Sequence, residues 1–269
     1  MPLHAFLITW TLLAALAGTA PAAAATPDVP LPTRPAFQST ETILRFINDY
    51  REHPRPSLMP RAVQAMSRLG LFRQIDEAGL YLGFIGGVLG ANSSRADALV
   101  AAMFPMQPHD QVAIIKGIAY SGLPEWKALL ARFVERMPAR KVLIERYLFG
   151  PLKPLHEMPM EEGPAALDAH WGFYFATGSK AAIRRIQRAL LWAEEKDDVE
   201  KLTVAGMAKW TLAKNAVRDL ELLRLMKSDA GRQPKVIAAE LAEIVEAVET
   251  YETARLRKDA IARIETRKQ

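Results

Sequence analysis

The stretch HWGFYFATGSKAAIRRIQRAL, from His170 to Leu190, decides how this chain folds. Its first part is rich in aromatic residues, and its last part carries apolar residues at helical spacing among basic ones. Between the two parts lie Gly178, a residue type that ends helices in the left-handed conformation, and Ser179, a residue type that caps the next helix. The stretch therefore predicts two packed helices joined by a tight turn.

Three more positions show the same arrangement, a Gly or Asn between two apolar-periodic segments: Asn92, Gly122 and Asn215. Ser93 or Ser94 and Pro124 supply start signals after the first two. Two of the three intervals between the turns fall within the ~30–45 residues of a helical repeat, and the longest contains the Pro-rich segment 150–164. We predict an array of αα-hairpins with an inserted loop at 150–164, and an irregular helical bundle is the alternative.

The rest of the chain also indicates an all-α protein. No segment shows the alternation of β-branched and polar residues that a strand would need. The first helix is expected to begin at Ser39 or Thr40, and we assign 39–230 to one α-helical repeat-like domain. Segment 231–269 predicts one long amphipathic helix, because Ile237, Leu241, Ile244, Val248 and Tyr251 form a short heptad stripe. That helix would pair with a partner as a coiled coil, or end as a solvated terminus.

The first 25 residues contain no Asp, Glu, Lys or Arg, and they end in three alanines after an apolar run. This pattern predicts a signal peptide that is cleaved after Ala25, followed by a Pro-rich linker at 26–38. An uncleaved membrane anchor is the alternative, although the apolar run is shorter than the ~20 residues of a transmembrane helix. We expect a periplasmic or secreted protein without a transmembrane span after cleavage. It contains no cysteine.

The aromatic residues before Gly178 admit two interpretations. Leu167, Trp171, Tyr174 and Phe175 fall on one helical face, which is typical of core packing, and an aromatic ligand pocket is the alternative. Gly172 within the cluster would let another helix approach closely.

Catalytic motifs are absent from the sequence, and we expect no enzymatic activity. Asp168 and His170 are two residues apart, so on a helix they point to different faces and cannot form an acid–base pair. His109 and Asp110 stand at a predicted helix start, where the carboxylate favours a capping role. An envelope hydrolase remains an alternative if Glu157, Glu161 and Glu162 face a cleft.

Two short segments suggest a copper carrier as a further alternative, because thioether and imidazole ligands together select Cu(I). The candidate ligands are Met103, Met106, His109, His156, Met158 and Met160. Otherwise no cofactor is expected.

The formal net charge of +5 is too small and too dispersed for a nucleic-acid-binding protein. A basic row after Gly178 fits an anionic envelope component, or simply a solvated face opposite the apolar one. The row comprises Lys180, Arg184, Arg185 and Arg188, and the apolar face comprises Ile183, Ile186, Leu190 and Leu191.

Four segments, YLGFIGGVLGAN, IAYSGLPEW, LDAHWGFYFATG and AKWTLAKNA, resemble a group of exported, all-helical bacterial proteins of unknown function. The resemblance runs from Tyr81 to Ala216 and rests on packing and turn residues, so it implies no catalytic residues. The hairpins also loosely resemble tetratricopeptide and HEAT-type arrays, although the period varies and the tetratricopeptide order of Trp, Gly, Tyr and Pro is missing. Because such arrays present a concave surface, we expect an exported scaffold that binds a protein or another envelope macromolecule.

Overall fold

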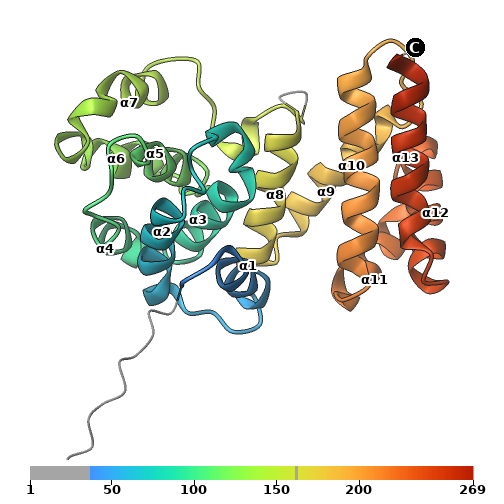
Figure 1. Ribbon diagram of the computed structural model, residues 1–269, viewed down its shortest axis with the longest axis horizontal. Helices are drawn as coiled ribbons and strands as arrows, with labels where there is room; N and C mark the ends of the chain where they lie inside the picture. The colour runs from blue at the N-terminus through green and yellow to red at the C-terminus, as the bar shows by residue number, and fades with distance from the viewer. Residues whose placement is uncertain (1–36, 161–162, 269) are drawn as a thin grey trace, which may run out of the picture. The chain divides into compact units, whose positions relative to one another are not determined.

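The computed structural model describes residues 37–160 and 163–268. The predicted signal peptide, its cleavage site, nearly all of the linker and the candidates Glu161 and Glu162 lie outside these ranges. Within them the chain forms α-helices, several joined by short 3-10 turns, and no β-strand, which confirms the all-α prediction (Figure 1). None of the helices in the two described ranges is both long and apolar enough to span a bilayer.

The α-helices follow one another along the chain as α1 (Thr40–Asp49), α2 (Met59–Arg68), α3 (Gly79–Ala91), α4 (Ala96–Ala101), α5 (Gln111–Ala119), α6 (Trp126–Ala131), α7 (Lys141–Leu148), α8 (Pro164–Thr177), α9 (Lys180–Arg188), α10 (Val199–Ala216), α11 (Leu220–Ala230), α12 (Lys235–Glu249) and α13 (Thr253–Lys268). The first begins where the sequence predicts, with Ser39 as its cap.

Helices α3 and α8 form the centre of the first eight helices and pack backbone to backbone. A Cβ atom on Gly83 would lie 1.8 Å from the carbonyl oxygen of Ala169, and one on Gly172 would lie 2.0 Å from that of Leu80. No side chain fits at either contact. Each glycine destabilises a helix by about 1 kcal/mol relative to alanine. The close approach of α8 offsets this cost, because α3 buries residues on nearly every side.

Three of the four predicted turns lie where a helix ends, and two of them take the left-handed conformation. Gly122 and Gly178 take left-handed conformations, with φ of 71° and 69°, as expected, and the Ser179 side chain accepts a hydrogen bond from the N–H of Ala182. Asn92 ends α3 at a φ of −127° instead, and its side-chain amide donates to the Val88 carbonyl. Asn215 lies inside the last turn of α10 and forms no turn. The repeat arrangement therefore stays a prediction.

The single long helix that we expected over 231–269 is wrong. Tyr251 takes a left-handed φ of 59°, and the N–H of Glu252 donates to the Ala247 carbonyl, which closes α12 and starts α13. The break lets α13 pack along α10, where a Cβ on Gly206 would lie 3.0 Å from that of Ala260. The stripe of α12 is buried within the chain at Ile237, Leu241, Ile244 and Val248, so a coiled-coil partner cannot use it.

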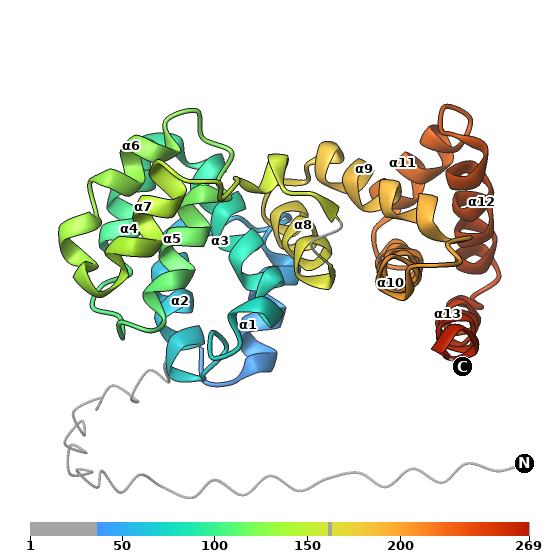
Figure 2. The same cartoon turned by 90° about the horizontal axis from the view of Figure 1, so that it is seen from above.

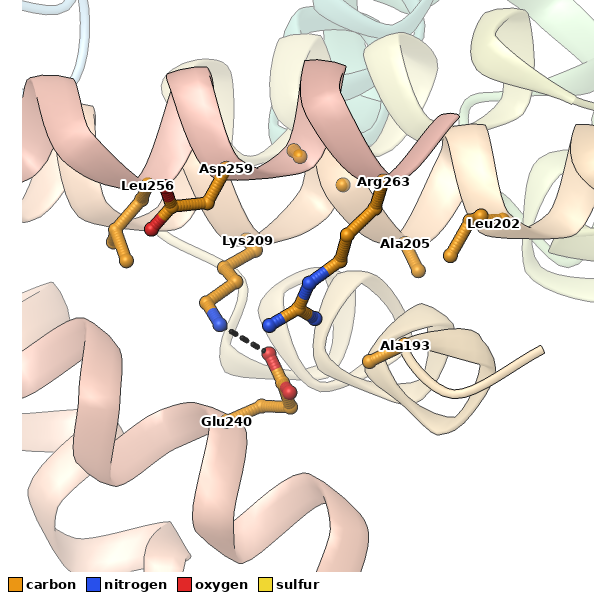
Figure 3. A pocket seen from close by; sticks show the side chains of 10 residues that line it. Ala193, Leu202, Ala205, Lys209, Glu240, Leu256, Asp259 and Arg263 are labelled. Atoms are coloured by element: carbon orange, nitrogen blue, oxygen red, sulfur yellow. Dashed lines mark ion pairs between the residues drawn. The ribbon is translucent and has the colours of Figure 1, made fainter. Parts of the chain in front are cut away.

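Helices α10, α12 and α13 pack together, and α9 lies between α8 and α10 (Figure 2). The buried Lys209 of α10 links α10 to α12. It forms an ion pair with Glu240 at 2.7 Å and donates a hydrogen bond to Glu243 at 2.5 Å. Figure 3 shows Arg263 of α13 reaching toward the same Glu240 carboxylate. The space between them is only about 20 Å³, room for one water molecule, so this cluster is structural.

Candidate functional site

A groove of about 640 Å³ lies where the end of α1, one face of α8, the second half of α10 and the turn into α11 meet. We call it the α1–α8–α10 groove. Helix α1 and the residues after it contribute Asn48 and Arg51, and the turn into α11 contributes Asp219. The remaining side chains used below are Asp168, Trp171 and Phe175 from α8 and Trp210, Thr211 and Lys214 from α10.

Aromatic rings form much of the wall of the groove. Trp171 and Phe175 stack with their centroids 5.7 Å apart, and the Trp171 indole N–H donates to the hydroxyl of Thr211 at 2.9 Å. Trp171 is buried, which confirms the predicted core role, whereas Phe175 and Trp210 are only half-buried. The Lys214 ammonium lies 4.9 Å from the Trp210 ring centroid, within cation–π distance. The aromatic residues of α8 therefore contribute both to the hydrophobic core and to the wall of the groove.

One carboxylate oxygen organises the polar end of the groove. Asp219 Oδ2 accepts hydrogen bonds from the Tyr174 hydroxyl at 2.6 Å and from Arg51 Nη2 at 2.7 Å. The other oxygen, Oδ1, caps α11 by accepting from the N–H groups of Glu221 and Leu222. Asp219 therefore ties the end of α1, α8 and the start of α11 together.

The same contacts set the charge states of the network. Burial alone would raise the pKa of Asp219, but the hydrogen bonds from Tyr174, the Leu222 N–H and Arg51 outweigh it, so the pKa is lowered and the group is ionised. Burial, together with the hydrogen bond to Asp219, raises the pKa of Tyr174, which keeps its proton. Every oxygen of Asp219 is thus committed to structural bonds.

Asp168 is the opposite kind of carboxyl group. Burial raises its pKa from 3.8 to about 6, and no hydrogen bond or ion pair within the described ranges involves it. It lines the groove, whereas His170 lines a different cavity across α8. The helical geometry that excludes an acid–base pair of these two residues is therefore confirmed, and Asp168 is left as an uncommitted acid in the groove.

The copper candidates divide between two environments. The thioethers of Met103, Met106, Met158 and Met160 are buried in the hydrophobic core. His109 and His156 have exposed side chains beside the carboxylates of Asp110 and Glu157, at 3.2 and 3.5 Å. Within the described ranges no three His, Asp or Glu side chains gather as metal ligands. The copper hypothesis stays a prediction.

Asp110 stands at the start of α5, but its side chain makes no capping hydrogen bond, which corrects the predicted role. Instead it accepts a hydrogen bond from the Ser67 hydroxyl. Glu157, the hydrolase candidate within the described ranges, is exposed beside His156.

The basic row of α9 is partly used inside the protein. Arg184 donates two hydrogen bonds of 3.1 Å to the buried Asp229 of α11, and Arg185 donates to the carbonyl of His156. Lys180 and Arg188 are exposed. On the other face, Ile183, Ile186 and Leu190 are buried, while Leu191 is exposed. The row is therefore an exposed face that also anchors α9 to α11.

Sequence reasoning missed Arg51, Trp210 and Asp219. Asp219 carried a usable signal, since an Asp before an apolar-periodic run is typical of a helix cap. Arg51 carried none, because its partner lies 168 residues away.

The chain matches no protein-family model, no curated protein and no solved structure. Its function is therefore inferred from the geometry of the described residues.

Proposed function

We propose that this protein is an exported scaffold that binds a segment of a polypeptide partner in the α1–α8–α10 groove. The observation that carries the proposal is the uncommitted carboxyl group of Asp168 in a wall that also holds Phe175 and Trp210. Aromatic rings are enriched in the centre of protein–protein interfaces, and charged groups are typical of their polar rim.

The charge of Asp168 favours a basic residue in the partner. Its carboxylate is desolvated and has no counter-ion among the described residues. A Lys or Arg side chain that enters the groove would pair with it and offset the desolvation. The apolar neighbours of that residue would then lie against Phe175 and Trp210.

Selection of random peptides on the purified full chain tests this proposal. We expect enriched peptides to combine Lys or Arg with apolar residues, and Asp168→Asn to weaken their binding at least about tenfold through loss of a charge-assisted contact. Trp210→Ala should also weaken it. The matched control is Val142→Ser, which alters a side chain that is 72% exposed outside the groove. Peptides without a basic residue, or equal affinity for the Asp168→Asn variant, would contradict the proposal.

Export rests on the uncharged, alanine-ending first 25 residues. The mass of the protein purified from its own cell envelope tests it, and a chain that begins at Thr26 is the expected result. A full-length chain in the cytoplasm would contradict export, but it would not contradict peptide binding in the groove.

An envelope hydrolase is the second candidate, because Asp168 and Asp219 line one groove with pKa values displaced in opposite directions. Binding is favoured over hydrolysis, since Asp219 is committed to Arg51, Tyr174 and the cap of α11. Release of soluble fragments from purified peptidoglycan, lost in the Asp168→Asn variant, would reverse this order.

A further inference from the structure

A second cavity, of about 300 Å³, lies on the other side of α8 from the groove. We call it the His170 cavity. The turn between α5 and α6, the segment before α8, α8 itself and the first turns of α9 all contribute to its wall. The residues used below are Tyr120, Leu155, His170, Phe173, Ala181 and Arg185.

His170 is the feature that points to a ligand. It is only 3% exposed, and its Nε2 has no hydrogen-bond partner among the described residues. Burial, aided by the charge of Arg185, lowers the pKa of its imidazole to about 3, so the ring is neutral at physiological pH. Buried polar atoms are almost always satisfied, and this one belongs to a residue that lines a cavity many times larger than the ~10–15 Å³ that one water molecule needs.

Arg185 brings a positive charge to a wall whose other polar side chains are those of Tyr120, His156 and Ser179. Arg185 is partly desolvated, which together with the charge of Arg188 lowers its pKa, although the group remains charged. Ala181 stands in the first turn of α9, and its backbone N–H has no acceptor among the described residues. The start of a helix favours negative charge, and no Asp or Glu of the described ranges lines this cavity. These groups together select an anion.

The remaining wall is apolar and is formed by Leu155, Phe173 and the ring of Tyr120. Leu155 is buried, and Phe173 is half-buried. A small ligand here would therefore need an apolar body as well as one negative group.

We infer that the His170 cavity binds a small free carboxylic acid with an apolar, aromatic-sized body. Its carboxylate contacts Arg185 and the N–H of Ala181, Nε2 of His170 donates a third hydrogen bond, and its body lies against Phe173 and Leu155. This site is independent of the proposed peptide groove, because the two cavities share no lining residue.

Calorimetric titration of the full chain with 3-phenylpropionate, and with its neutral amide, tests the inference. We expect the acid to bind at least about tenfold more tightly than the amide, as a charge-assisted contact implies. Arg185→Met should abolish that preference. Arg188→Met, on the same helix and outside the cavity, should leave it unchanged. Equal affinity for acid and amide, or an unaltered preference in Arg185→Met, would overturn the inference.

Two further measurements sharpen the test. His170→Phe should weaken binding of the acid and raise the unfolding midpoint of the free protein, because it replaces an unsatisfied polar atom with an apolar ring of similar size. If His170→Phe left both the affinity for the acid and the unfolding midpoint unchanged, the role of His170 would be contradicted. If this variant fails to fold, the Arg185→Met titration still tests whether the cavity binds an acid. A tripeptide with a C-terminal Phe is also tested. If it binds more tightly than 3-phenylpropionate, the site recognises the C-terminus of a polypeptide, and the inference that it binds a small free acid is overturned.

Discussion

The Arg51 guanidinium lies 2.7 Å from Asp219 Oδ2, the same oxygen that accepts the Tyr174 hydroxyl at 2.6 Å. The Arg51 guanidinium also lies 5.0 Å from the centre of the Tyr174 ring and donates a hydrogen bond to its hydroxyl. Three segments that are distant in the chain therefore depend on one partly buried polar network at the end of the groove.

Tyr174→Phe removes the hydroxyl that joins Arg51 to Asp219. We expect it to lower the free energy of unfolding by about 1–2 kcal/mol, because partly buried partners lose their hydrogen bonds. Urea denaturation measures the change. Tyr251→Phe, at a ring that is 86% exposed, is the control and should be neutral. Equal effects of the two changes would show that the network does not stabilise the fold.

Gly83→Ala tests the close contact of α3 with α8. Its new Cβ would lie 1.8 Å from the Ala169 carbonyl oxygen, so one helix has to move. We expect a loss of about 3 kcal/mol or more, or failure to fold. Gly231→Ala is the control, since no atom lies within 4 Å of its Cβ and φ is −72°. Thermal unfolding should show no loss for the control, and similar midpoints for both variants would contradict the packing.

Lys209→Met leaves Glu240 buried beside α10 without its ion pair. We expect a loss of about 3–5 kcal/mol, as for other broken buried pairs. Adding Glu240→Leu should recover most of it, because a well-packed apolar pair avoids burying a charge. Denaturant unfolding of the single and double variants gives both values. A double variant no more stable than the single one would argue against an unpaired charge as the cause.

The stability of the protein should depend on the ionisation of Asp168. Its pKa is about 6 in the folded protein against 3.8 ordinarily, so between these values the folded state binds more protons and stability falls as pH rises. Asp168→Asn should equal the wild type below pH ~4 and be more stable above pH ~6 by at most about 3 kcal/mol. Urea denaturation across this range measures the difference between the two proteins, which isolates Asp168 from other titrating groups. A difference that does not vary with pH would contradict the displaced pKa.

Turns, helix caps and close helix contacts could be predicted from the sequence, because each depends on the residue type at one or two positions. Gly178 and Ser179 mark the turn between α8 and α9 because the left-handed conformation and the helix cap depend on the residue itself. Gly172 indicates close helix contact because only a missing side chain permits it. The break at Tyr251 could not be predicted, since tyrosine is not a residue type that ends helices in this way. It accompanies the packing of α13 on α10, a contact between segments that are far apart in the sequence.

By itself, then, the sequence determined the all-helical class, three of the four predicted helix ends and the burial of most of the aromatic face of α8, because periodicity and capping act over a few residues. Only the tertiary structure decided which helices meet. It placed Asp168 in a groove with Trp210, and His170 in a separate cavity with Arg185, although Asp168 and His170 are two residues apart. Sites of this kind leave no local pattern, because packing between distant segments chooses the partner of each side chain.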